Sequence, residues 1–303
     1  MNQLASIPEE PRGKERLIVL LDADRSSVLG NATNGILSAL DLSHALHTQD
    51  TDLLLQLMKP MLNPRMTEAV RALSDQYEVL VAIYTARGLI AQTLIREGGS
   101  SMQVLADGKT VALQPTRNKR DLNYLRAQAR PGSMMSEALA HLGLLACAMA
   151  DAIGLKYAPA VFVTHGTKSP RLVKTHMGFP NVRAVLFDDQ GIRYARQLLP
   201  DAGLSKGQRA IRTGILPVPP FDIAQWDIPA AQALAATLNA NNIRPKNEEA
   251  VVKMFMNFFT DFTTGRWDFA PAIRKARDKN ETWELDKDAP WPIRSVALIG
   301  NII

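Results

Sequence analysis

Four stretches of apolar residues stand out along the first two thirds of the chain. They cover 17–24, 78–85, 158–166 and 182–190, with the sequences LIVLLDAD, EVLVAIYT, APAVFVTHG and VRAVLFDDQ. Because neighbouring positions in each stretch are both apolar, both faces of the segment are expected to be buried. This pattern is typical of central strands in a parallel sheet that is covered on both sides. We therefore predict four such strands.

Amphipathic segments lie between these strands. The pattern predicts helices over 66–76, 136–154 and 168–178, each just before one of the three later strands. Strands that alternate with helices indicate an α/β fold, here a Rossmann-like parallel sheet flanked by helices. In such sheets ligands bind at the carboxyl ends of the strands. All four apolar stretches end in polar or charged residues, so the site is expected at that edge.

Two connections are longer than a tight turn between a strand and a helix. The first, at about 27–64, is expected to form a flap or a small helical insertion over the strand ends. The second, at about 88–131, contains a sequence typical of a hairpin around Asp107 and Gly108. Both are interpreted as cap segments inserted into the core.

The composition changes near residue 204. A proline-rich linker and further helical patterns follow, so 205–303 is expected to be a mostly helical C-terminal extension that is dispensable for chemistry. The catalytic core would then cover 16–204. Residues 1–15 are expected to be a flexible lead-in.

Composition and charge narrow the class of protein. The 303 residues are 46% apolar and 21% charged, as in globular proteins, and a net charge of +5 mildly favours anionic partners. The single cysteine, Cys147, excludes an intrachain disulfide and a cysteine-rich zinc module. No apolar run reaches the roughly 18 residues of a membrane helix. The polar N-terminal segment lacks an apolar signal core, so we expect a cytoplasmic protein without membrane contact.

Acidic residues follow two of the predicted strands. Asp22 and Asp24 leave the first strand at positions i and i+2, so both can turn toward one site. One can act as a nucleophile while the other transfers protons. Asp188 and Asp189 end the last predicted strand. These carboxylates together offer hard oxygen ligands of the kind that Mg²⁺ prefers.

Two further residues are candidates for binding a phosphoryl group, and a third is a supporting candidate. Thr85 ends the second strand, and its hydroxyl can donate to a phosphate oxygen. Lys168 lies at the start of a predicted helix, where its charge would offset that of the nucleophile and of a phosphoryl group. Arg87 follows Thr85 closely and is a supporting candidate.

The order of these motifs resembles the haloacid dehalogenase-like (HAD) superfamily. Its first motif, an apolar strand followed by Asp-x-Asp-x-Thr/Ser, is matched by LIVLLDADRSSV, and its second, an apolar strand ending in Thr or Ser, by VLVAIYTARG. Its third is a lysine at the start of a helix, and its fourth, a strand ending in paired acids, is matched by AVLFDD. The resemblance covers about 17–199.

The resemblance implies a Mg²⁺-dependent phosphatase that hydrolyses a phosphomonoester through an aspartyl-phosphate. Asp22 would attack phosphorus. Asp24 would protonate the leaving group and then activate water. Thr85 and Lys168 would hold the phosphoryl oxygens.

The same resemblance implies a metal site. Asp188 would bind Mg²⁺ together with Asp22 and the main-chain carbonyl of Asp24. Asp189 would support this site through water. Arg25 departs from the small or apolar residue expected after the second aspartate, and it either contacts substrate or narrows the range of substrates.

The lysine of the third motif has two candidates. Lys168 lies 20 residues before Asp188, the usual spacing of the family, and we prefer it. Lys174 lies 14 residues before Asp188. That shorter spacing resembles the protein phosphatases of the C-terminal-domain type within the superfamily, so Lys174 stays an alternative.

A basic stretch at 116–130 bears on the partner of the protein. It carries five cations against one acid, and it is a candidate surface for a nucleic acid or an acidic protein, or else a solvated basic helix. We expect a phosphorylated substrate, either a small molecule or a phosphate on a protein or nucleic acid. A HAD-like scaffold that binds a partner without turnover is the alternative from another class.

Overall fold

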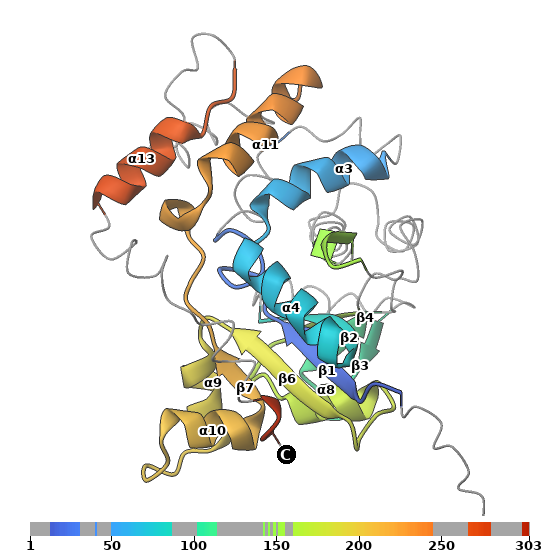
Figure 1. Ribbon diagram of the computed structural model, residues 1–303. Helices are drawn as coiled ribbons and strands as arrows, with labels where there is room; N and C mark the ends of the chain where they lie inside the picture. Colours follow the sequence, from blue (N-terminus) through green and yellow to red (C-terminus); the bar gives the residue numbers. More distant parts are fainter. Residues whose placement is uncertain are drawn as a thin grey trace, which may run out of the picture.

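A seven-stranded sheet forms the centre of the computed structural model (Figure 1). The residues described are 13–30, 40, 50–86, 102–113, 142, 145, 148–149, 151–154, 160–244, 266–279 and 299–302. The strands lie in the order β3-β4-β5-β2-β1-β6-β7. Their bounds are β1 Arg16–Leu21, β2 Glu78–Thr85, β3 Met102–Val104, β4 Thr110–Leu113, β5 Ala160–Thr164, β6 Arg183–Asp188 and β7 Ile215–Pro217.

The four apolar stretches form the parallel centre of this sheet. β1 pairs in parallel with β2 on one side and with β6 on the other, and β2 pairs in parallel with β5. The α/β fold and all four predicted strands are therefore confirmed. Residues 17–21 of β1 are completely buried, as expected for a strand covered on both faces.

Helices cover both faces of the sheet. Leu17, Val19 and Leu21 point into a core shared with α4 (Pro64–Gln76), α3 (Thr51–Met58) and α11 (Ile228–Ala240). Ile18 and Leu20 point the other way, into a core shared with α8 (Pro170–His176) and α9 (Gly191–Leu198). The predicted helices at 66–76 and 168–178 thus correspond to α4 and α8. Within 136–154, every described residue up to 152 is helical.

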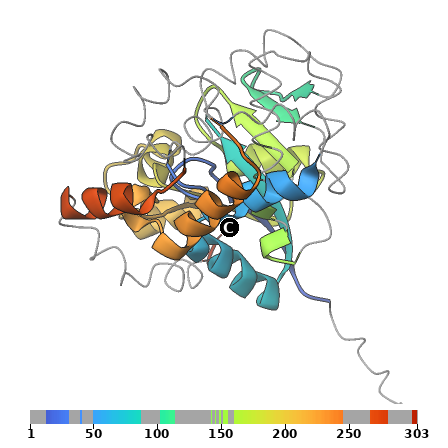
Figure 2. The ribbon, with the colours of Figure 1, turned by 90° about the horizontal axis from the view of Figure 1, so that it is seen from above.

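Both predicted insertions are described only in part. The first contains α3 and the short helix η1 (Lys59–Met61), which agrees with a small helical insertion. In the second, β3 and β4 form the predicted hairpin, with Gly108 at a φ of 66° in its turn. β4 also pairs antiparallel with β5. This hairpin therefore extends the sheet at one edge (Figure 2), so 102–113 belong to the sheet, while the rest of the insertion at about 88–131 lies outside the described residues.

The predicted boundary at residue 204 cuts through the sheet and was wrong. α10 (Lys206–Thr213) follows this boundary and leads into β7, which pairs in parallel with β6. Gly214 ends α10 in the left-handed region, at a φ of 69°, and a Cβ there would lie 2.5 Å from the carbonyl oxygen of Ala184. Only glycine fits this approach of α10 to β6. The prolines around β7 had suggested a linker.

The remaining C-terminal elements also pack on the core. η3 (Ile223–Gln225) and α13 (Ala270–Lys279) contact each other, and α11 contacts α3 and η1. Ile299 and Ile302 are buried near the C-terminus, and Arg183 at the start of β6 donates to the carbonyl of Gly300. The described parts of the extension are largely helical, and they are not separate from the core. None of the helices in the described ranges has the length and apolar character needed to cross a membrane.

Candidate active site

Two acidic residues meet at the carboxyl ends of the central strands. Asp22 follows β1 directly and Asp188 is the last residue of β6, its parallel neighbour. The main-chain N–H of Asp22 donates to the carbonyl of Phe187 at 2.9 Å and so continues the pairing of the two strands. Both carboxylates are almost fully buried. The strand ends therefore place two charged groups side by side away from water.

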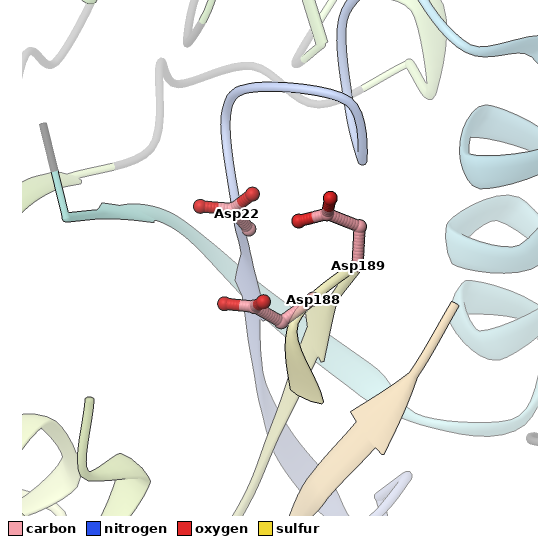
Figure 3. A group of neighbouring side chains, drawn as sticks. All are labelled: Asp22, Asp188 and Asp189. Carbon is pink, nitrogen blue, oxygen red and sulfur yellow. The ribbon is translucent and has the colours of Figure 1, made fainter. Parts of the chain in front are cut away.

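Asp189 completes a group of three carboxylates (Figure 3). One oxygen from each of Asp22, Asp188 and Asp189 lies within 4.8 Å of the other two. Hard oxygen ligands in such a group fit Mg²⁺. Asp189, for which the resemblance implies a role through water, has its carboxylate in this group. The side chain of Asp24 is not part of this group.

Lys168 lies between the first two carboxylates. Its Nζ donates to Oδ1 of Asp22 and, at 2.6 Å, to Oδ2 of Asp188, and only 1% of the residue is exposed. The chain turns into α8 immediately afterwards, because the side chain of Ser169 caps that helix. Lys174 lies in the last turn of α8, and no contact links it to these acids. Of the two candidate lysines, the structure brings Lys168 to the acidic residues.

The hydroxyl of Ser26 ties the two strand ends together. Its Oγ donates to Oδ2 of Asp22 at 3.0 Å and accepts from the main-chain N–H of Asp189 at 2.9 Å. The side chain of Asn63, just before α4, donates to the carbonyl of Ser26 at 2.7 Å. The Asp22 carboxylate is therefore held on one oxygen by Lys168 and on the other by Ser26.

The remaining residues predicted from the sequence lie outside the group of three carboxylates or outside the described residues. Thr85 ends β2 beside β1 and is 1% exposed. Asp24 lies in the loop after β1, where it is half-buried and its main chain forms an isolated β-bridge with Val28. Arg87 and the basic stretch at 116–130 lie outside the described residues.

Burial controls the protonation of the cluster. It raises the pKa of Asp22 to about 7; Lys168 counteracts the shift, whereas Asp188 and Asp24 add to it. Burial alone would lower the pKa of Lys168, but the charges of Asp22 and Asp188 outweigh it and raise that pKa. Burial and then the charge of Asp188 also raise the pKa of Asp189. Asp22 and Asp189 thus need positive charge nearby to stay ionised.

A second cation reaches the site from the loop after β1. Arg25 has a φ of 59°, a left-handed conformation that is uncommon for residues other than glycine. Its Nη1 lies 3.6 Å from Oδ2 of Asp189, while Nε and Nη2 donate to the two oxygens of Asp222 at 2.9 and 2.7 Å. Asp222 and Arg25 are 197 residues apart in the sequence. Arg25 therefore links the acidic cluster to the C-terminal part of the chain.

Sequence reasoning missed Asp222. Its local pattern marks only the start of η3, where it forms a capping box with Gln225. Phe221, just before Asp222, also contacts Arg25: its main-chain N–H donates to the carbonyl of Arg25 at 2.6 Å. A contact between such distant segments leaves no periodic signal in the sequence.

Comparisons with protein-family models, curated proteins and solved structures gave no match for this chain. The geometry of the site is therefore the basis for a functional proposal.

Proposed function

We propose that the protein is a Mg²⁺-dependent phosphatase with a HAD-like core, which hydrolyses a phosphomonoester through an aspartyl-phosphate. One observation carries the proposal: the buried Nζ of Lys168 is shared by Asp22 and Asp188 at the carboxyl ends of neighbouring parallel strands. Buried ion pairs contribute little net stability. Strongly perturbed charged groups at the ligand-binding edge of a sheet are typical of catalytic sites.

The donor set supports a divalent cation. Asp22, Asp188 and Asp189 would hold Mg²⁺, whose charge would help neutralise the phosphoryl group when bound. These ligands are all carboxylates, and the group contains no histidine or cysteine. Such a set favours Mg²⁺ over softer transition metals.

Asp22 has the role of nucleophile in this proposal. One of its carboxylate oxygens attacks phosphorus, and the bond from phosphorus to the ester oxygen breaks. The leaving oxygen takes the electron pair of that bond and a proton from Asp24. Lys168 favours the ionised form of Asp22 and offsets the negative charge that accumulates on the phosphoryl oxygens.

Hydrolysis of the aspartyl-phosphate restores the protein. Asp24, now deprotonated, accepts a proton from a water molecule as that water attacks phosphorus. The bond between phosphorus and the Asp22 oxygen breaks, and inorganic phosphate leaves. Thr85, at the end of the adjacent strand, supplies a hydroxyl for a phosphoryl oxygen.

Turnover of a panel of phosphomonoesters, with Mg²⁺ and with EDTA, tests the proposal. We expect hydrolysis that requires Mg²⁺ and is abolished in Asp22→Asn, which keeps the size of the side chain but lacks the attacking charged oxygen. Asp75→Asn, on the exposed face of α4, is the matched control and should retain activity. Absence of turnover with every ester, despite binding of Mg²⁺, would instead favour the non-catalytic scaffold.

A further inference from the structure

The helices beside the candidate site carry unbalanced positive charge. Together α8, α9 and α10 contain seven lysine and arginine residues and no aspartate or glutamate. The whole chain has a net charge of +5, so all other residues together carry two net negative charges. These three helices, which we name the basic flank, thus carry more positive charge than the chain has in excess, and the stretch at 116–130, outside the described residues, is basic as well.

Most of these basic side chains are exposed and form no ion pair with a described residue. Only Arg209 is buried, and its guanidinium donates to main-chain carbonyls of the loop before α10. The other six side chains form no ion pair with any residue in the described part of the chain. They are Arg171, Lys174, Arg193, Arg196, Lys206 and Arg212. Lys174 is half-buried, and the other five are exposed.

The basic flank starts at the candidate site. Lys168 lies just before α8, and Asp188 and Asp189 lie just before α9. The ring of Tyr194 in α9 lies 5.4 Å from the Nζ of Lys168. The hydroxyl of Thr167 also donates to the side chain of Gln197 in α9, at 3.2 Å. The first turns of both helices therefore adjoin the acidic cluster.

The cations continue outward from that point. Arg171 and Arg193 occupy the first turns of α8 and α9, and Lys174 and Arg196 follow three residues later in the same helices. Residues three apart lie on one side of a helix. α10 packs against α9 and adds Lys206 and Arg212 (Figure 1). The three helices themselves contain no acid among these cations, and the exposed Asp201 lies in the loop between α9 and α10.

We propose that the basic flank binds the sugar–phosphate backbone of a single nucleic-acid strand whose phosphorylated end enters the candidate site. A strand presents regularly spaced phosphates, and four of the six available cations are arginines, which bind phosphate in a bidentate manner. A lipid surface fits less well, because Leu198 is the one large apolar residue of the flank that is exposed. The entry of the strand end rests on the proposed phosphatase function; the binding of the strand does not.

Fluorescence anisotropy with a labelled, 5′-phosphorylated single-stranded DNA tests the binding. The flank variant is Arg171→Gln/Arg196→Gln/Lys206→Gln, with one substitution in each helix. The control Arg274→Gln/Lys275→Gln/Lys279→Gln removes the same charge from exposed positions of α13. We expect the flank variant to lose at least about tenfold in affinity at moderate salt. The slope of log K against log salt concentration should become less negative by about two. The control should bind like the wild type.

The remaining outcomes overturn the proposal. Equal loss of DNA affinity in both variants would mean that binding follows net charge. If the wild type does not bind the DNA, the flank is not a nucleic-acid surface. Tighter binding to vesicles of anionic lipid, or displacement of the DNA by poly-glutamate at matched charge, would assign the flank to a membrane or to an acidic protein.

Both triple variants should unfold at the wild-type temperature and hydrolyse a small phosphomonoester normally. If the wild type binds DNA but hydrolyses no ester, the phosphatase proposal fails and the binding surface stands.

Discussion

The two ends of the central strands carry similar ion pairs in opposite surroundings. At the amino end, Arg16 of β1 pairs with Glu78 of β2 at 3.1 Å, and Arg183 of β6 pairs with Glu15 at 2.8 Å. These side chains are between 29% and 55% exposed. At the carboxyl end of the same strands, the side chains of Lys168, Asp22 and Asp188 are at most 8% exposed.

The difference separates ion pairs that stability alone can explain from a buried cluster that it does not explain. Exposed pairs contribute between about 0 and 1 kcal/mol each, and water or salt can replace them. Burial of an ion removes several kcal/mol of hydration, which a partner repays only in part. Stability alone therefore accounts for the pairs at the amino end but not for the cluster at the carboxyl end. A bound cation and a phosphoryl group would give the buried charges a role.

Removal of Lys168 should produce the largest effect. Lys168→Met leaves the charges of Asp22, Asp188 and the phosphoryl group without their shared counter-charge. We expect the rate of phosphomonoester hydrolysis to fall by on the order of 10²–10³, as for the loss of other preorganised charge-stabilising groups. Steady-state kinetics of Lys174→Met provide the matched control, and that variant should be close to wild type. A crippled Lys174 variant beside a normal Lys168 variant would reverse the assignment and favour the protein-phosphatase alternative.

The acids at the end of β6 should differ in their effect on Mg²⁺. Asp188 accepts a hydrogen bond from the Nζ of Lys168, whereas the carboxylate of Asp189, whose side chain is 8% exposed, faces Arg25. Loss of even an indirect partner of a metal ligand reduces affinity by roughly 10–100-fold, so Asp188→Ala should lose at least that much and Asp189→Ala less. Titration of activity, and of binding heat, against Mg²⁺ measures both. Equal losses would show that the two acids act jointly.

Asp222 should have a smaller effect that acts through Arg25. Asp222→Asn removes one partner of Arg25, which then keeps Asp189 as its one anionic neighbour among the described residues. Closer pairing of Arg25 with Asp189 would compete with the cation, so we expect the apparent affinity for Mg²⁺ to fall by up to about tenfold. Asp222→Glu should restore most of it, while Asp75→Asn should change nothing. An Mg²⁺ titration that superimposes on wild type would show that Arg25 does not influence the acidic cluster.

The amino end should respond least. Glu78→Gln removes the charge that faces Arg16, and the free energy of unfolding should change by less than about 1 kcal/mol. Urea unfolding at low and high salt measures this change, which should shrink as salt rises. Mg²⁺-dependent turnover should be unaffected. A large loss of activity would mean that the two ends of the sheet are coupled, contrary to the comparison above.

The sequence predicted the parts of this picture that depend on local pattern. Buried runs marked β1, β2, β5 and β6, and the rule that ligands bind at strand ends singled out Asp22 and Asp188. Lys168 was chosen for its place at the start of a predicted helix and for the spacing that the family resemblance implies. β7 was not predicted, because its three residues end in Pro217 and resemble a linker. They form a strand only by pairing with β6. The hairpin was visible around Gly108, but its pairing with β5 was not.

The link between Arg25 and Asp222 could not be predicted for the same reason. Each residue lies in a loop, where no hydrophobic periodicity indicates its neighbours. Their contact depends on how the chain returns after β7 to the loop that follows β1. Dispensability of 205–303 was a reasonable expectation from composition, but β7 and Asp222 both lie in that range. Truncation at residue 204 would remove an edge strand and the partner of Arg25.

The phosphorylation state of Asp22 tests the central claim most directly. The protein is mixed with Mg²⁺ and a reactive phosphomonoester, quenched in acid within the first turnover, and analysed by peptide mass spectrometry. We predict one phosphoryl group on the peptide that contains Asp22, its loss when the quench is delayed until substrate is exhausted, and its absence in Asp22→Asn. Mg²⁺-dependent hydrolysis with no phosphoryl group on that peptide at any time, or with undiminished turnover in Asp22→Asn, would contradict the account.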